Sequence, residues 1–333
     1  MSKKDFSRRE FLAVGAAVTA GCFLSRPVVA EKKAPALTLS RCDEIRLLQF
    51  TDLHLFAGIS HQPEISEVQR RQTIDDMRRL IDHTRPDLLV ITGDFWHENP
   101  DGRGMEFLNF SVEKVGGLGV PWVFTWGNHD KLDDYDLGHK ALAAASNSLY
   151  GGTLESRGDY ITPVLDGNGN VLLELFCLNT EGHGVDAKIR LFVRDAVAKE
   201  AEDFKRPMRM GAFHIPIRHH DHVWENGRAR GVKGEPVCFE GEDGSALSAF
   251  KEAGIQAVMC GHDHTNDYSG RAEGVELIYG RASGYNGYGG ETLEKGAKLY
   301  RLDPARSSLH WESVVPDGRR WNPGPTERRL IDS

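Results

Sequence analysis

Short runs of large apolar residues alternate along the first half of the chain with longer stretches of helical periodicity. The apolar runs are typical of buried strands, and the periodic stretches are typical of amphipathic helices. The strand patterns occupy residues 44–51, 87–92 and 121–126, and the helical patterns occupy residues 63–84 and 105–115. Short links between them favour right-handed parallel crossovers in one sheet, so the carboxyl ends of these strands are expected along one edge.

The second half mixes hairpin, helical and strand patterns. Asp166-Gly167-Asn168-Gly169 is a strong turn signal. It predicts a hairpin between residues 160–163 and 171–179. Further helices are expected at residues 191–201 and 245–253, and further strands at residues 208–214, 256–260, 275–279, 297–302 and 309–314. We therefore expect one α/β domain at residues 44–315, built from two packed sheets with helices outside, after a linker at 31–43 and before a loosely attached tail at 316–333.

Residues 1–30 have the pattern of a twin-arginine export signal. Arg8-Arg9 precedes the apolar run Phe11–Leu24, and Ala30 stands where cleavage is expected. This predicts the twin-arginine translocation machinery as a partner, and a periplasmic or secreted mature protein. The alternatives are a short membrane anchor, although the run is well below the ~20 residues that a spanning helix needs, and a lipoprotein modified at Cys22. No later segment is long and apolar enough to predict stable membrane insertion.

Composition and charge narrow the functional classes. The 333 residues are 40% hydrophobic and 27% charged, which excludes disordered and collagen-like chains. Loss of residues 1–30, with five basic and two acidic side chains, would shift the formal net charge from -8 to -11. So acidic a chain is not expected to bind nucleic acid. Cys177 and Cys260 lie in apolar runs and are expected to be buried thiols, whereas pairing of Cys42 with Cys238 stays open.

Metal-ligand residue types follow five of the predicted strands. Seven side chains of this kind are Asp52, His54, Asp94, Asn128, His214, His262 and His264. On an extended backbone, residues two apart point to the same side, so each Asp-x-His or His-x-His pair can serve one ion. A histidine of this kind is, by itself, more often structural. Five clusters together predict two ions roughly 3.5–4 Å apart, for which the mixed oxygen and nitrogen donors favour Mn, Fe or Zn.

Such a pair of ions supports hydrolysis at phosphorus, because it polarises phosphoryl oxygens and makes hydroxide available from water near neutral pH. His129 is the candidate acid that protonates the leaving group, and Asp130 or another carboxylate is expected to orient its ring. Candidate contacts to a small phosphorylated substrate are Trp96, His97, His219 and Arg281. For each of these the alternative is a purely structural or solvated side chain.

The ordered motifs Asp52-x-His54, Gly93-Asp94, Gly127-Asn128-His129-Asp130, His214 and Gly261-His262-x-His264 resemble those of the calcineurin-like metallophosphoesterases. Within that superfamily the chain most resembles the small purple-acid-phosphatase-like proteins, through stretches such as residues 213–217, 260–267 and 279–285. The resemblance implies a four-layer α/β/β/α sandwich. It also implies that Asp94 is shared between two ions, one completed by Asp52, His54 and His264 and the other by Asn128, His214 and His262.

The same resemblance implies that His129 is the catalytic histidine. True purple acid phosphatases have a tyrosine ligand where this chain has His97, so the purple ferric colour is not expected. We expect an exported, binuclear metal-dependent phosphoesterase acting on a phosphomonoester or small phosphodiester. The alternatives are a cyclic-nucleotide or glycerophosphodiester phosphodiesterase of the same fold and, in a different class, a metal-binding protein without turnover.

Overall fold

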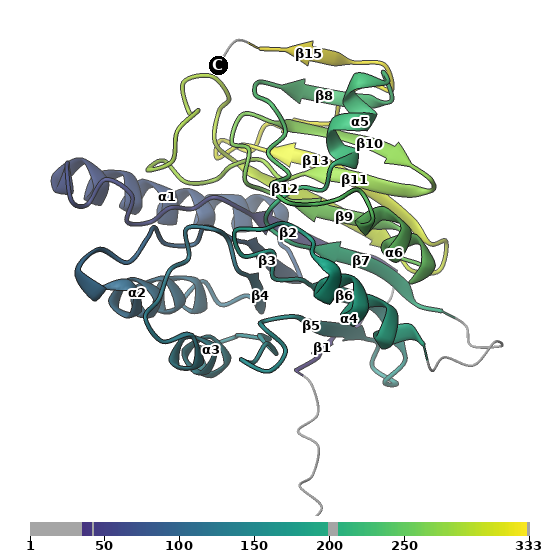
Figure 1. Cartoon of the computed structure of the whole chain (residues 1–333), viewed down its shortest axis with the longest axis horizontal. Coiled ribbons are helices and arrows are strands. Elements are labelled where there is room, and N and C mark those ends of the chain that lie inside the picture. Colours follow the sequence, from purple (N-terminus) through teal and green to yellow (C-terminus); the bar gives the residue numbers. More distant parts are fainter. Residues whose placement is uncertain (1–34, 42, 199–205, 332–333) are drawn as a thin grey trace, which may run out of the picture. The chain divides into compact units, whose positions relative to one another are not determined.

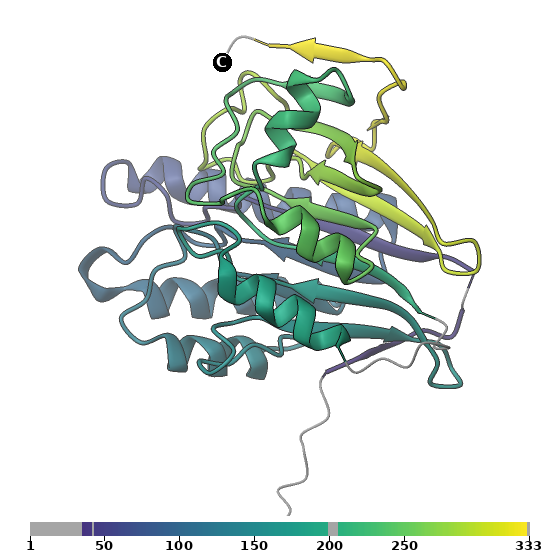
Figure 2. The same cartoon turned by 45° about the vertical axis from the view of Figure 1, so that its right-hand side comes forward.

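Two β-sheets packed face to face, with helices on their outer faces, make up the fold (Figure 1). The structure, a computed structural model, describes residues 35–41, 43–198 and 206–331. The expected export signal and Cys42 lie outside the described residues. Helices α1 to α3 cover one sheet and α4 to α6 cover the other, as the two views show (Figures 1 and 2). The predicted α/β sandwich of two mixed sheets is confirmed.

The six-stranded sheet has the order β14-β13-β12-β2-β3-β4. Its parallel part is formed by β2 (Ile45–Phe50), β3 (Leu88–Thr92) and β4 (Trp122–Thr125), as the first half of the sequence predicts. Its antiparallel part is formed by β12 (Ala297–Asp303), β13 (Ser308–Val314) and β14 (Arg320–Trp321). The covering helices are α1 (Pro63–Thr84), α2 (Gly104–Gly116) and α3 (Tyr135–Ala144), with a 3-10 turn, η2, at Pro100–Gly102.

The nine-stranded sheet has the order β1-β5-β6-β7-β9-β11-β10-β8-β15. Its strands are β1 (Leu37–Thr38), β5 (Tyr160–Leu165), β6 (Val171–Cys177), β7 (Met208–Ala212), β8 (Ala229–Lys233), β9 (Ala257–Cys260), β10 (Asp267–Ala272), β11 (Val275–Tyr279) and β15 (Arg328–Leu330). Its helices are α4 (Ala187–Val197), α5 (His219–Glu225) and α6 (Ala246–Glu252). The hairpin predicted across residues 166–169 is confirmed as the antiparallel pair of β5 and β6.

The largest differences from expectation lie near the ends of the chain. The tail was expected to be loosely attached, which is wrong for its described part: β14 pairs with β13, and β15 pairs with β8. Within the expected linker, β1 pairs with β5. These strands were missed because they are only two or three residues long, which is too short to show a periodic sequence pattern.

Other elements were missed or misplaced within the domain. α3, α5, β8 and β10 were not predicted, and α4 begins four residues before the predicted helix. α1 has its predicted bounds, but Ile65 and Val68 on its first turns are more than half exposed. The helix therefore packs through its second half, around the buried residues Ile74, Met77 and Leu80.

A buried ionic group joins the two sheets, and we call it the Asp267 cluster. Asp267 on β10 accepts hydrogen bonds from Arg281 Nε at 2.7 Å, from Ser313 Oγ at 2.8 Å, and from the ammonium of Lys298. Lys298 and Ser313 lie on β12 and β13 of the other sheet. Burial opposes ionisation, but the two cations lower the pKa of Asp267. The cluster therefore links the two sheets through buried ion pairs and hydrogen bonds.

Candidate metal centre

The seven expected ligands come together where β2, β3, β4, β7 and β9 end. The first group is formed by Asp52, His54 and His264, whose donor atoms all lie within 4.8 Å of one another. His264 Nε2 lies 3.4 Å from Asp52 Oδ1 and 3.2 Å from His54 Nε2. All three side chains are buried. This group therefore places a carboxylate and two imidazole nitrogens around one point.

The second group is formed by Asp94, His214 and His262, again within 4.8 Å. His214 Nε2 lies 3.2 Å from Asp94 Oδ2, 2.9 Å from Asn128 Oδ1 and 3.3 Å from His262 Nδ1. Asp94 Oδ2 is also 3.4 Å from His54 Nε2, which belongs to the first group. One carboxylate oxygen thus faces both groups, as expected of a side chain shared by two ions.

The backbone around these ligands is held in uncommon conformations. Asp52, His54, Asp94 and His262 have φ of 53°, 43°, 51° and 80°. The extended backbone assumed for the Asp52-x-His54 pair is therefore wrong: both residues take left-handed conformations beyond the end of β2. Non-glycine residues rarely adopt such angles, each of which costs about 1–3 kcal/mol unless the surroundings compensate. Hydrogen bonds from the Asp52 N–H to the Gly93 carbonyl at 3.2 Å and from the His54 N–H to the Asp94 carbonyl at 2.8 Å hold two of these residues in place.

Glycines allow the strand ends to approach this closely. A Cβ on Gly93 would lie 2.6 Å from the His214 ring, and one on Gly127 would lie 2.3 Å from the Asp94 backbone nitrogen. Gly93 also has φ of 81°. Any larger residue at these two positions would push a ligand out of place.

The pKa shifts differ among the candidate ligands. Burial opposes the charge on His214, but Asp94 raises the pKa of His214 to about 10, so a metal ion would bind there in exchange for a proton. Burial lowers the pKa of His54, and burial together with His214 lowers the pKa of His262 to about 4, so both rings are neutral and offer a lone pair at pH 7. Burial opposes the charge on Asp52, but His264 and His214 lower its pKa below the usual range. The donor set of two carboxylates, four imidazoles and one amide oxygen therefore fits transition ions such as Mn, Fe or Zn.

His129, the predicted proton donor, lies beside this cluster. Its backbone N–H donates to Asp94 Oδ1 at 2.9 Å, and its ring centroid is 5.3 Å from that of His54. His97 stacks on it at 4.5 Å, with its own Nδ1 3.0 Å from His54 Nδ1. His97 also lines the cavity over the candidate ligands.

The carboxylate that holds the ring of His129 belongs to Glu98. His129 Nδ1 is 2.7 Å from Glu98 Oε1. Of the two possibilities expected for this role, Asp130 or another carboxylate, the second holds: Asp130 instead accepts backbone hydrogen bonds from Phe95 at 2.8 Å and Gly127 at 2.8 Å, and it is buried. Burial and the charge of Asp94 raise the pKa of Asp130 to about 8. Sequence reasoning missed Glu98 because it follows Asp94 by four residues in an irregular loop.

Three of the expected substrate contacts lie elsewhere. Trp96 is fully buried, and its indole Nε1 donates to the Lys131 carbonyl. Arg281 is buried in the Asp267 cluster, where it is already paired with a carboxylate. His219 opens α5 and does not line the cavity over the metal ligands. None of the three is placed to bind a phosphate group at the candidate centre.

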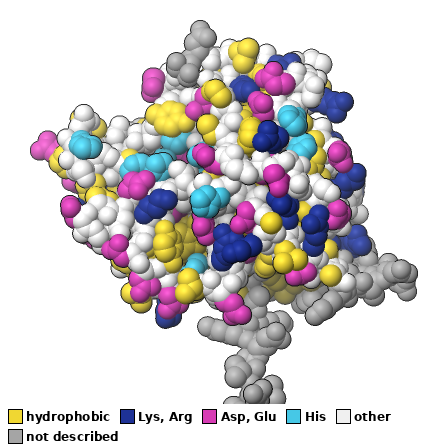
Figure 3. Space-filling view, viewed as in Figure 1, with side chains coloured by type: hydrophobic (Ala, Val, Ile, Leu, Met, Phe, Trp, Pro, Cys, Tyr) yellow, Lys and Arg dark blue, Asp and Glu magenta, His cyan; other side chains and the backbone are white. Residues whose placement is uncertain are grey.

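A cavity of about 430 Å³ lies over the ligands. Besides His54, Asp94, His262 and His264 it is lined by side chains that the sequence did not single out, among them Glu240, Asn286 and Tyr288. The Tyr288 ring stacks on His264 with centroids 4.0 Å apart. On the face of the molecule that Figure 3 shows, histidine side chains lie at the surface among acidic ones.

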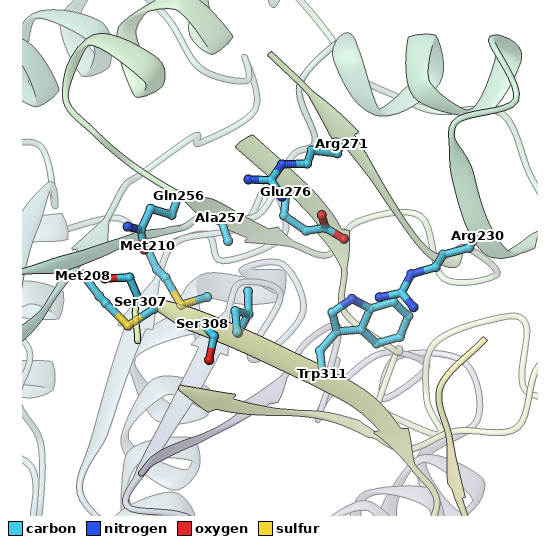
Figure 4. A pocket seen from close by; sticks show the side chains of 11 residues that line it. Met208, Met210, Arg230, Gln256, Ala257, Arg271, Glu276, Ser307, Ser308 and Trp311 are labelled. Atoms are coloured by element: carbon cyan, nitrogen blue, oxygen red, sulfur yellow. The ribbon is translucent and has the colours of Figure 1, made fainter. Parts of the chain in front are cut away.

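A separate cavity of about 330 Å³ lies at the opposite edge of the strands, where β7 and β9 begin (Figure 4). Met208 and Met210 line it from one sheet and Trp311 from the other. It contains none of the seven ligands and is therefore not part of the candidate centre.

The family model that matches residues 45–266 is described as calcineurin-like phosphoesterase. Among curated relatives, an Arabidopsis thaliana protein named "Probable inactive purple acid phosphatase 28" is 23% identical, over 85% of this chain and 82% of its own length. "Phosphatase DCR2" of Saccharomyces cerevisiae is 25% identical, over 84% of this chain and 55% of its own length. A dimetal phosphatase from Danio rerio is similar in structure, with a TM-score of 0.50, 12% identity, and 82% and 96% of the two chains covered.

Proposed function

Because the chain belongs to the calcineurin-like phosphoesterase family, we propose that it is a two-metal phosphoesterase that hydrolyses a phosphomonoester or a small phosphodiester. The observation that carries this proposal is the convergence of two ligand groups on Asp94, with His129 at their edge. Mn, Fe or Zn would be held by Asp52, His54 and His264 on one side and by Asn128, His214 and His262 on the other. When bound, such a pair polarises the phosphoryl group and lowers the pKa of water.

The chain's own residues supply positioning and proton transfer. Glu98 accepts a hydrogen bond from the Nδ1–H of His129, which leaves Nε2 to carry the proton that the departing alkoxide needs. The His129 backbone donates to Asp94 Oδ1, so the proton donor and the shared ligand are held as one unit. Burial of five of the candidate ligands, Asp52, His54, Asp94, His214 and His264, limits the access of bulk water and strengthens the charge interactions among them.

Hydrolysis assays with metal analysis test this proposal. Residues 31–333 supplied with Mn²⁺, Fe²⁺ or Zn²⁺ are expected to retain about two ions per chain and to cleave p-nitrophenyl phosphate or its bis ester. His129→Ala should keep the metal and lower kcat by about 10²–10⁴-fold. Full metal content with no hydrolysis across a broad panel of phosphate esters would instead establish a metal-binding protein without turnover, in line with the relative whose name calls it inactive.

We also propose that the enzyme acts after export through the twin-arginine pathway, on the support of Arg8-Arg9 and the apolar run that follows them. Replacing both arginines by lysine should leave the full-length precursor inside the cell. Cell fractionation with antibody detection measures this. Efficient export of the double variant would contradict the proposal.

A further inference from the structure

A second cavity, of about 480 Å³, adjoins the cavity over the candidate ligands. The two cavities share four lining residues, which are Ala57, Asn286, Gly287 and Tyr288. We call the second one the Lys295 cavity, after a lysine in its wall. His129 lines the cavity over the ligands together with the shared residues. A substrate bound there can therefore contact the proton donor and extend into the Lys295 cavity.

Lys295 is a buried cation without an acidic partner. It is 2% exposed, and its ammonium forms no ion pair with any residue of the described ranges. It donates one hydrogen bond, to the Tyr288 carbonyl at 2.5 Å, which leaves two N–H donors. Burial lowers the pKa of Lys295 to about 8, although Asp52 opposes the shift, so the side chain is charged at pH 7. A buried cation of this kind favours binding of an anion.

The Lys295 ammonium also lies close to the candidate metal centre. His264 Nδ1 lies 3.1 Å from the same Tyr288 carbonyl oxygen. A carbonyl in this position favours the tautomer of His264 with the proton on Nδ1 and leaves Nε2 for an ion. Lys295 and a candidate ligand thus share one hydrogen-bond acceptor, which joins the two cavities at the level of single atoms.

The start of α1 adds positive potential to the Lys295 cavity. Gln62, Ile65, Ser66 and Gln69 line the cavity from this end of the helix. The side chain of Gln62, the residue before α1, makes no capping hydrogen bond. A helix N-terminus carries a partial positive charge, which favours anions. Glu291 also lines the cavity, but it is exposed and is not paired with Lys295 in the described ranges.

Hydrogen bonds hold the loop between the two cavities in place. Asn286 Nδ2 donates to the carbonyls of Leu55 at 3.1 Å and Ser66 at 3.2 Å. The Tyr285 hydroxyl donates to Asp76 Oδ2 on α1 at 2.8 Å. The connection between the cavities is therefore formed before a substrate binds, which lowers the entropic cost of binding.

We propose that the Lys295 cavity binds the alcohol part of the substrate, and that this alcohol carries a second anionic group, such as another phosphate, which Lys295 binds. This inference rests on the proposed function. In the reaction, oxygen from water forms a bond to phosphorus, the bond from phosphorus to the ester oxygen breaks, and His129 transfers its proton to the departing alkoxide. The products are phosphate and an alcohol that keeps its second anionic group.

Phosphate esters of straight-chain diols test the proposal, because each diol can be phosphorylated at one end or at both. Diols of four, six and eight carbons vary the distance between the two groups. The metal-loaded protein is expected to prefer the bisphosphate of the diol that spans the two cavities by about tenfold or more in kcat/KM. Lys295→Met should lower this preference by about 10–100-fold, the size expected for losing one hydrogen bond to a charged group. Lys188→Met is the matched control, since Lys188 is exposed on α4 outside the cavity.

Gln69→Glu tests the same cavity at a partly exposed position, where the fold tolerates substitution more readily than at buried Lys295. Its added negative charge should lower the preference for the bisphosphate by about 3–10-fold. Gln69→Leu adds no charge and should leave the preference within about twofold of the parent value.

Binding of the corresponding bisphosphonates, measured by calorimetry, gives a readout that needs no turnover. The Kd should rise by about tenfold or more in Lys295→Met and stay unchanged in Lys188→Met. Equal kcat/KM for both esters of every diol, or a preference that Lys295→Met and Gln69→Glu leave unaltered, would overturn the subsite and leave the proposed function intact. Absence of hydrolysis with every ester would overturn the proposed function, and bisphosphonate binding would then still report on the Lys295 cavity.

Discussion

The candidate metal centre and the Asp267 cluster are both buried groups of charged and polar side chains between the sheets. They differ in the side chains that compensate the negative charge of their carboxylates. Asp267 faces two side chains that are cationic at neutral pH, Arg281 and Lys298, so its charge is compensated within the chain. Asp94, the carboxylate that faces both candidate ligand groups, lies against the imidazoles of His54 and His214, whose charge depends on protonation. A buried carboxylate whose partners are Arg and Lys stabilises a fold. A carboxylate whose partner is an imidazole such as His214, with a pKa raised to about 10 by Asp94, can exchange the proton of that partner for a metal ion.

The strongest test of this contrast removes the shared carboxylate. Asp94→Asn should lower kcat/KM by at least about 10³-fold and reduce the bound metal, because several kcal/mol of charge stabilisation depend on both ions. Metal content by mass spectrometry and hydrolysis assays measure the change. The metal-free variant should fold normally, as circular dichroism can check. Undiminished metal content and activity would show that Asp94 is not shared between ions.

Removing the other carboxylate should affect stability. Asp267→Ala leaves Arg281 and Lys298 buried without their partner, and we expect the free energy of unfolding to fall by about 3–5 kcal/mol. Urea denaturation measures this. Asp303→Ala, which removes a surface partner of the exposed Arg306, is the matched control and should cost less than about 1 kcal/mol. Similar losses in both variants would contradict the role assigned to the Asp267 cluster.

The excess of cations in the Asp267 cluster predicts a pH dependence. Burial lowers the pKa of Lys298 to about 8, although Asp267 opposes the shift, whereas an unfolded lysine titrates near 10.5. Between these values the unfolded chain binds more protons, so the free energy of unfolding should rise with pH by up to about 3 kcal/mol. Denaturation of the parent and of Lys298→Met between pH 8 and 10.5 isolates this contribution. An equal slope in both proteins would contradict it.

The smallest expected effect concerns the carboxylate at the rim of the metal centre. Glu98→Gln keeps a hydrogen-bond acceptor for His129 but removes its charge, so kcat should fall by about tenfold and the basic limb of the pH–rate profile should move to lower pH. The metal content should not change. Glu98 would be dispensable if both the rate and the profile matched those of the parent protein.

The sequence was most informative where burial and periodicity act over several residues. The parallel strands β2, β3 and β4 and the helix at residues 63–84 were predictable because each buries a continuous apolar pattern. The seven ligands could be selected because polar residues of ligand type directly follow such strands. Their backbone conformation could not be predicted from the sequence, because the φ of 53° at Asp52 results from packing against the loop after β3.

Contacts between side chains from distant parts of the chain could not be predicted from the sequence. Arg281 resembled a phosphate-binding arginine because it lies in a glycine-rich loop, and only the fold reveals that Asp267 is its partner. Glu98 had no pattern to mark it, because its contact with His129 depends on an irregular loop with φ of 58°. In both cases the deciding fact was a contact between side chains, which local pattern does not specify.

The pairing of β12 with β2 has a consequence for synthesis of the protein. Lys298 lies opposite Gln49, so the two strands are separated by nearly the whole domain. A nascent chain that has emerged from the ribosome as far as β11 already contains every ligand from Asp52 to His264, but β2 still lacks its neighbour on one side. The strand that leads directly into Asp52 and His54 is therefore completed late, and we expect translation to be nearly finished before these two side chains take their final positions.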